Sequence, residues 1–236
     1  MQFQVKKFIM TNKKAFIFDL DGVIVDTAKY HFLAWQKIAS QLGIEFTPEH
    51  NEHLKGVSRV RSLDIILELG KIKATQEDKN KWLIQKNEDY LSYLVVMDQS
   101  EILPGVFHIL EFIKEKNQLI ALGSASKNAR PILEKTGILN LFDAIVDGND
   151  VSNAKPDPEV FLRAARLLNT SNENSIVFED SVAGIQAANT ANMVSVGIGD
   201  KKILHEAKYI FSDFTFMDVS FIEALCLPNP SKGGAL

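Results

Sequence analysis

The sequence predicts an α/β fold, namely a doubly wound parallel sheet with an inserted helical cap domain. Short apolar runs alternate with helical patterns over most of the 236 residues, which is the arrangement of an open α/β sheet. The alternation stops once, between residues 27 and 98, where only helical patterns occur. These two observations fix the expected architecture.

Five apolar runs are expected to form the strands. None has the clean polar alternation of a half-exposed strand, so both faces of the sheet should be covered by helices. The runs occupy residues 15–21, 119–126, 144–148, 175–180 and 193–199. Helical patterns between them occupy residues 104–117, 127–137 and 157–169. Pro104 and Pro158 lie near helix starts, where proline is tolerated.

The interruption is expected to form a separate helical cap. Helical patterns occupy residues 30–43, 61–70 and 80–96, and in the first of them Tyr30, Ile38 and Leu42 fall on one face. We therefore expect an α/β catalytic core made of residues 1–26 and 99–236, and a cap made of residues 27–98.

Composition narrows the possible functions. The net charge is −4, so the composition gives no sign of the basic surface that a nucleic-acid-binding protein needs. No apolar stretch reaches the ~20 residues that a membrane span needs. Cys226 is the only cysteine, which excludes an internal disulfide and fits a reducing compartment. We expect a cytoplasmic monomer that acts on small molecules. The first ten residues make a poor signal peptide, Met10 is an alternative start to Met1, and the last ten residues are expected to fray.

Polar residues follow four of the predicted strands. Asp19 and Asp21 follow the first, "GSASKN" (residues 123–128) the second, Lys155 the third, and Glu179-Asp180-Ser181 the fourth. Because the carboxyl ends of parallel strands meet at one rim, these groups should converge there.

The residue types at this rim suit phosphoryl transfer. Two carboxylates as close as Asp19 and Asp21 repel each other, and a cation would offset that repulsion. Asp19 and Asp180, with Glu179 as a further candidate, offer the hard oxygen ligands that Mg²⁺ prefers. Ser124, expected at a helix N-terminus, and Lys155 could bind a phosphate. Asp19 suits a nucleophile and Asp21 a general acid/base.

The motifs resemble a known superfamily. "DLDGVIVDT", "GSASKN", "KPDP" and "EDS", in this order, are similar to the motifs of the haloacid dehalogenase (HAD) superfamily of phosphotransferases, whose core is Rossmann-like. Finer features resemble the β-phosphoglucomutase family: "YHFLAW", "LKGVSR", "QKNEDY", "SASKN" and "EDSVAGIQA". This resemblance implies interconversion of β-D-glucose 1-phosphate and glucose 6-phosphate, through an aspartyl-phosphate and with glucose 1,6-bisphosphate as intermediate and primer.

The resemblance also implies residue roles. Asp19 would be the nucleophile and Asp21 the general acid/base, and Asp19, the Asp21 carbonyl and Asp180 would bind one Mg²⁺, with Glu179 in or near that shell. Ser124 and Lys155 would bind the transferring phosphoryl group. Ala125 and Lys127 would also belong to the phosphate- and substrate-binding residues. Binding of the distal phosphate falls to Arg59, Ser126 and Asn128. The cap side of the site would be lined by His31, Trp35, Lys55, Gly56 and Lys86, with Thr27 at the hinge.

Other interpretations remain open at this stage. A sugar-phosphate phosphatase needs the same core residues but tolerates an open cap, and a non-catalytic sugar-phosphate-binding protein needs only the fold. A dehalogenase is disfavoured because its chemistry needs neither a metal nor a general acid. His31 and Trp35 could be core residues and Lys86 a solvated helix residue. Val60 and Arg61 stand where the family often carries acidic residues, so Arg61 is either an additional phosphate ligand or a solvated side chain.

Overall fold

The protein is described here by a computed structural model covering residues 13–227, and the predicted fold class is confirmed. Six parallel strands form one sheet in the order β3-β2-β1-β4-β5-β6. The strands are β1 (Ala15–Phe18), β2 (Leu119–Gly123), β3 (Ala144–Val146), β4 (Ser175–Glu179), β5 (Val194–Ile198) and β6 (Tyr209–Phe211). The expectations for the two chain ends concern residues that lie almost entirely outside the described range.

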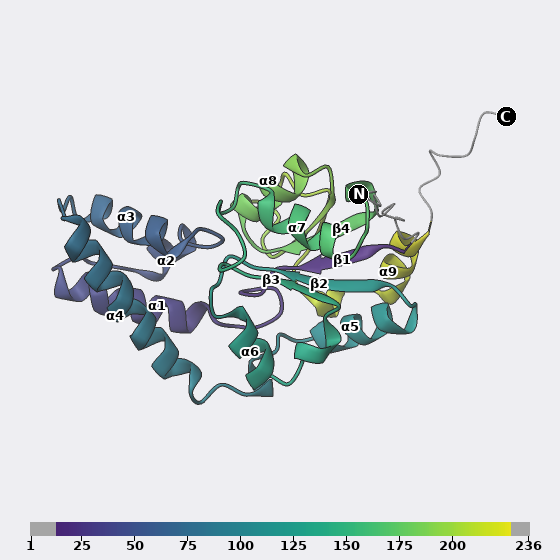
Figure 1. Ribbon diagram of the computed structural model, residues 1–236, viewed down its shortest axis with the longest axis horizontal. Helices are drawn as coiled ribbons and strands as arrows, with labels where there is room; N and C mark the ends of the chain where they lie inside the picture. Colours follow the sequence, from purple (N-terminus) through teal and green to yellow (C-terminus); the bar gives the residue numbers. More distant parts are fainter. Residues whose placement is uncertain (1–12, 228–236) are drawn as a thin grey trace, which may run out of the picture.

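Helices cover both faces of the sheet (Figure 1). They are α5 (Val106–Glu115), α6 (Ala129–Lys135), α7 (Glu159–Leu167), α8 (Val182–Thr190) and α9 (Val219–Cys226), with short 3-10 turns η1 (Gln99–Glu101), η2 (Leu139–Leu141), η3 (Asn172–Asn174) and η4 (Phe214–Phe216). Phe16 and Phe18 of β1 pack with α5, α6 and α9 on one face, while Ala15 and Ile17 pack with α7 and α8 on the other. The strands read as apolar runs because both faces are buried.

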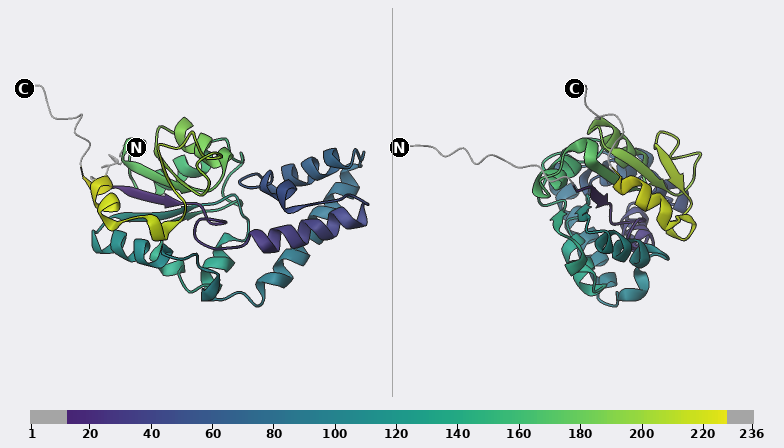
Figure 2. Two further views of the ribbon diagram at one scale, coloured as in Figure 1. Left: turned by 180° about the vertical axis from the view of Figure 1, so that it is seen from behind. Right: turned by 90° about the vertical axis from the view of Figure 1, so that its right-hand side faces the viewer.

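Four helices between β1 and α5 form the cap. They are α1 (Ala28–Gln41), α2 (Pro48–Glu52), α3 (Arg59–Leu69) and α4 (Gln76–Leu94). They lie together beyond the carboxyl ends of the strands (Figures 1 and 2). Trp35, Ile38, Leu63 and Ile66 belong to an apolar cluster of the cap alone, while Tyr90 joins the main core cluster.

Local sequence sets where the cap helices begin. Thr75 caps α4 in a capping box with Asp78, and the Ser58 hydroxyl accepts a hydrogen bond from the backbone N–H of Arg61 at the start of α3. These caps fix the loops before α3 and α4, and the loop before α3 faces the core. None of the helices between residues 13 and 227 is both long enough and apolar enough to cross a membrane.

The two connections between cap and core run side by side. Val25 forms an antiparallel bridge with Ile102, and the Leu103 N–H donates to the Ile24 carbonyl at 3.0 Å. Beside this pair the Tyr30 hydroxyl donates to a carboxylate oxygen of Glu101 at 2.5 Å. The chain therefore enters and leaves the cap at one place.

Candidate active site

A cavity of about 540 Å³ lies between the cap and the carboxyl ends of the strands. Every residue predicted for the site lines it except Thr27 and Glu179, and each of these hydrogen-bonds a residue that does. The cap also contributes Asn51, Ser62 and Leu83, which lie outside the sequence motifs. Their positions depend on how α2, α3 and α4 pack, so no local pattern identifies them.

Three carboxylates converge at the end of β1. Asp19, Glu179 and Asp180 each offer an oxygen, and these oxygens all lie within 4.8 Å of one another. The Lys155 ammonium lies between two of them, 2.5 Å from Asp19 Oδ1 and 2.7 Å from Glu179 Oε2. Burial alone would lower the pKa of Lys155, but the two carboxylates raise it above its ordinary value. Lys155 is therefore a permanent cation at this end of the cavity.

Lys155 alone does not balance the negative charge of the three carboxylates. Burial raises the pKa of Asp19 well above its usual range despite Lys155, and burial with the neighbouring Glu179 raises the pKa of Asp180 to about 7. Gly22, at φ +82°, leaves room for Asp180, because a Cβ there would overlap its carboxylate. A compact group of oxygen donors whose negative charge is under-compensated fits a divalent cation such as Mg²⁺.

Asp21 faces the same cavity from a different environment. Its Oδ1 accepts a hydrogen bond from the Thr27 hydroxyl, and burial raises the pKa of its carboxyl group although Thr27 opposes this. His31 Nε2 lies 3.8 Å from the same oxygen, while His31 Nδ1 lies 2.9 Å from the Lys86 ammonium. Burial, and then Lys86, hold the pKa of His31 well below its usual value, so the imidazole is neutral.

Lys86 is a buried cation on the cap side. Its ammonium lies 5.1 Å from the ring centre of Trp35 and 4.5 Å from that of Tyr90. Burial and the nearby Arg59 lower the pKa of Lys86 to about 7, against a raising effect of Asp21. Lys86 is thus neither a solvated helix residue nor an ordinary lysine, and Trp35 serves both the cap cluster and the cavity wall.

The segment 124–128 follows β2 as a tight turn. The buried Ser124 hydroxyl accepts a hydrogen bond from the Ser126 N–H at 3.0 Å, and the Ser126 hydroxyl accepts one from the Asn128 N–H at 3.2 Å. The expectation that Ser124 lies at a helix N-terminus is wrong, because α6 begins only at Ala129. The hydroxyl-rich turn itself separates strand from helix.

Two further cations face the cavity without an anionic partner. Within residues 13–227, no carboxylate lies within ion-pair distance of Arg59 or Lys127. Burial lowers the pKa of Arg59 from its high ordinary value. Arg61, by contrast, pairs with Glu68 at 2.8 Å on the exposed side of α3 and does not line the cavity. The unpaired cations indicate an anionic ligand.

Three further contacts join the cap to the core around the cavity. The Lys55 ammonium lies 3.4 Å from Asp180 Oδ2, and the Asn128 amide donates to Asn87 Oδ1 at 3.1 Å. Gly56, at φ +72°, packs against Ser181 so closely that a Cβ would overlap the serine hydroxyl. The cap therefore rests on the core.

Comparison with known proteins places this geometry in a family. The family model described as haloacid dehalogenase-like hydrolase matches residues 16–198. The chain is 45% identical over 188 residues to a protein named beta-phosphoglucomutase of Bacillus subtilis, covering 79% of this chain and 83% of that protein. It is 34% identical over 202 residues to a phosphorylated carbohydrates phosphatase of Thermotoga maritima, covering 82% and 91%. A crystal structure of beta-phosphoglucomutase from Clostridium difficile superimposes with a TM-score of 0.86 at 43% identity, covering 90% of this chain and 96% of that one. The chain therefore belongs to the haloacid dehalogenase-like hydrolase family.

Proposed function

We propose that the protein is a Mg²⁺-dependent β-phosphoglucomutase that interconverts β-D-glucose 1-phosphate and glucose 6-phosphate. The relatives from Bacillus subtilis and Clostridium difficile, both above 40% identity, carry that name. In this proposal residues 1–26 and 99–236 form the catalytic core and residues 27–98 the cap. In this proposal the protein acts as a monomer.

One observation carries the proposal. A single cavity has Asp19 and Asp21 on its core wall and an unpaired arginine, Arg59, on its cap wall. A mutase must hold two phosphates at once, one at the nucleophile and one away from it. A guanidinium can bind the second phosphate through two parallel hydrogen bonds.

The first half-reaction uses both aspartates. An Asp19 carboxylate oxygen attacks a phosphorus of glucose 1,6-bisphosphate, and the bond from that phosphorus to the sugar oxygen breaks. Asp21, whose carboxyl pKa is raised by burial, gives its proton to the departing sugar oxygen. The products are the aspartyl-phosphate and a glucose monophosphate.

The second half-reaction reverses these roles. The free 6-hydroxyl of β-D-glucose 1-phosphate attacks the aspartyl-phosphate and gives its proton to the Asp21 carboxylate, which regenerates the bisphosphate. The bisphosphate turns around, and transfer of its 1-phosphoryl group to Asp19 releases glucose 6-phosphate. Ser124 and Lys155 hold the transferring group at Asp19. Glucose 1,6-bisphosphate is therefore both the intermediate and the primer.

A bound Mg²⁺ would supply charge stabilisation to the phosphoryl oxygens. Asp19, Asp180 and the Asp21 carbonyl would hold it, with Glu179 beside them. Glu179 is occupied in part by Lys155 and by the Ser181 hydroxyl, which donates to Glu179 Oε1 at 2.6 Å. The principal ligands in this proposal are thus Asp19 and Asp180.

The rival function is a sugar-phosphate phosphatase, as the name of the Thermotoga maritima relative indicates for that protein. A coupled assay separates the two. We expect glucose 6-phosphate to form from β-D-glucose 1-phosphate, with a rate that depends on added glucose 1,6-bisphosphate. Release of free phosphate without glucose 6-phosphate would reject the mutase and support the phosphatase.

A further inference from the structure

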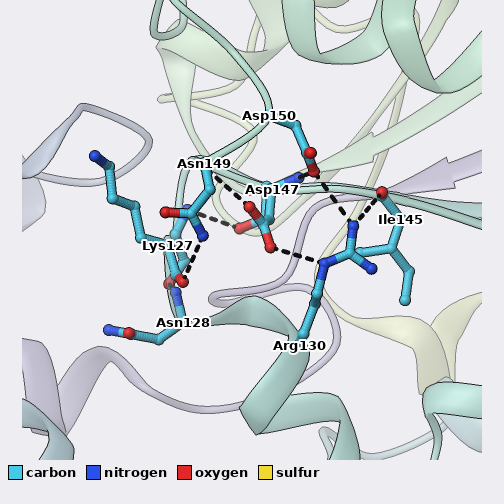
Figure 3. A network of polar contacts seen from close by, with 9 residues as sticks. Lys127, Asn128, Arg130, Ile145, Asp147, Asn149 and Asp150 are labelled. Atoms are coloured by element: carbon cyan, nitrogen blue, oxygen red, sulfur yellow. Dashed lines mark hydrogen bonds and ion pairs between the residues drawn. The ribbon is translucent and has the colours of Figure 1, made fainter.

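A polar network lies behind the segment 124–128, outside the cavity (Figure 3). At its centre is Asp147, which follows β3 and is only 2% exposed. Its Oδ2 lies 3.2 Å from Arg130 Nε, and its Oδ1 accepts a hydrogen bond from the Asn149 N–H at 2.8 Å. Arg130 also donates to the Ile145 carbonyl at 3.0 Å and lies 3.3 Å from Asp150 Oδ2. The guanidinium thus ties the start of α6 to the turn after β3.

The same turn holds the backbone of the segment 124–128. The Gly148 N–H donates to the Ser126 carbonyl at 3.1 Å, and the Asn149 side-chain amide donates to the Lys127 carbonyl at 3.0 Å. Gly148 has to be glycine, because a Cβ there would overlap the Ala125 carbonyl oxygen. Two carbonyls of the segment are therefore held from behind.

The side chains of the segment point the other way. In Figure 3 the Lys127 and Asn128 side chains extend away from the Asp147–Arg130 pair. Both residues line the cavity, whereas Arg130, Asp147 and Asn149 do not. Gly148 of the same turn also lines the cavity, so the three side chains of the network can affect a ligand only through the backbone that they hold.

The backbone of Ser124 is held by the sheet and not by this network. Its N–H donates to the Val146 carbonyl at 3.0 Å, which continues the pairing of β2 with β3, and its side chain is fully buried. Helix α6 has only seven residues and no side-chain cap at Asn128, so it cannot fix the segment alone. Loss of the network should leave Ser124 in place and release residues 126–128.

We propose that Arg130, Asp147 and Asn149 are positioning residues that hold Ser126, Lys127 and Asn128 for the distal phosphate of a bisphosphate ligand. The proposal rests on the proposed function, in which the distal phosphate is bound by this segment and Arg59. It goes beyond that function because none of the three residues touches the cavity. Their effect should be confined to ligands that carry a second phosphate.

The test compares two phosphoryl donors. Acetyl phosphate needs only Asp19, Ser124 and Lys155, whereas glucose 1,6-bisphosphate also needs the distal site. In Arg130→Met and in Asn149→Ala, the half-saturating concentration of glucose 1,6-bisphosphate should rise about tenfold, the scale of one lost hydrogen bond. The rate of phosphorylation by acetyl phosphate should stay within about twofold of the unmodified protein.

Two further variants make the comparison specific. Arg130→Lys keeps the positive charge but loses the forked geometry of the guanidinium. It should therefore raise the half-saturating concentration of glucose 1,6-bisphosphate less than Arg130→Met does. Arg61→Met removes an exposed arginine that pairs with a carboxylate on α3, away from the cavity. It should change neither the half-saturating concentration of glucose 1,6-bisphosphate nor the rate with acetyl phosphate. Asn149→Ala leaves the backbone contact to Asp147 intact, so it perturbs the fold least.

Two results would overturn the proposal. An equal loss of activity with both donors would mean that the network only supports the fold. Unchanged activity with both donors would mean that the network does not position residues 126–128. Failure of the proposed function looks different, because the unmodified protein would then form no glucose 6-phosphate. A phosphatase still hydrolyses the bisphosphate, so its half-saturation can still be compared among the variants.

Discussion

Asp19 and Asp21 are separated by one residue and have different surroundings. Asp19 is buried against Lys155 and lies among the carboxylates, while Asp21 is half-buried and bonded to Thr27. In the proposed function, the surroundings of Asp19 and Asp21, and not their residue type, make one the nucleophile and the other the acid/base.

Substitution of each aspartate should give a different defect. Asp19→Asn should abolish formation of the acid-labile phosphoryl adduct with acetyl phosphate, because the amide is not a nucleophile of comparable strength. Asp21→Ala should still bind Mg²⁺, since its backbone carbonyl remains, but turnover should fall by roughly 10²- to 10⁴-fold. Adduct formation is measured with radiolabelled donor. Retained turnover in Asp19→Asn, once deamidation is excluded by mass spectrometry, would remove the nucleophile assignment.

Lys86 should give substrate binding a pH dependence. With a pKa of about 7, its ammonium is charged below that pH and neutral above it. Half-saturation by β-D-glucose 1-phosphate should therefore rise as pH increases from 7 to 9, because the anionic ligand loses a cation. Lys86→Arg stays charged throughout and should flatten this limb of the profile. Identical profiles for the two proteins would show that Lys86 does not contact the ligand.

Among the elements, the loop before α3 carries the closest approach of cap to core. Gly56→Ala places a methyl group against Ser181 and should hold the cap away. We expect turnover to fall roughly tenfold or more and the share of aspartyl-phosphate lost to water to rise, because orientation and water exclusion both depend on closure. Glucose 6-phosphate and free phosphate are measured together.

Gly43→Ala is the matched control for that change. Gly43 also has a positive φ, +68°, but no atom lies within 4 Å of the added Cβ. Both variants therefore carry similar backbone strain, and only one obstructs the cap. A loss of turnover as large in Gly43→Ala would assign the effect to strain.

The elements also show which features the sequence can predict. Five strands and six helices gave clear apolar runs or periodic patterns, and the motifs at the strand ends identified the core of the site. Strand β6, with three residues of which Tyr209 is exposed, has no comparable signal. Helix α2, with five residues, is too short to show a period. Asn51 lines the cavity because of how the cap helices pack, and no motif includes it.

At the scale of the whole molecule, metal and proton should compete for the carboxylates. Asp180, with a pKa of about 7 against about 3.9 in an unfolded chain, binds a proton more readily when folded. Its contribution to the free energy of unfolding therefore decreases as pH rises from about 4 to 7 in metal-free protein. Bound Mg²⁺ should reverse this loss, because it favours the ionised form.

The stabilisation by Mg²⁺ should consequently grow with pH. A tenfold weaker affinity at pH 6 than at pH 8 corresponds to about 1.4 kcal/mol, or a Tm increment about 3–6 °C smaller for a chain of this size. Thermal unfolding at both pH values, in excess EDTA and in about 10 mM Mg²⁺, measures this Tm increment. Asp180→Asn should lose most of the increment. An increment equal at both pH values would contradict the assignment of Asp180 as a ligand.

The paired connections at Val25 and Ile102 have a consequence for how such molecules diversify. Since the chain enters and leaves the cap at adjacent positions, the four cap helices form an inserted domain that joins the core at one place. An inserted domain of another length or shape can be accommodated there without altering the spacing of the strands. Substrate preference can thus be exchanged as a module while the phosphoryl-transfer chemistry is inherited intact.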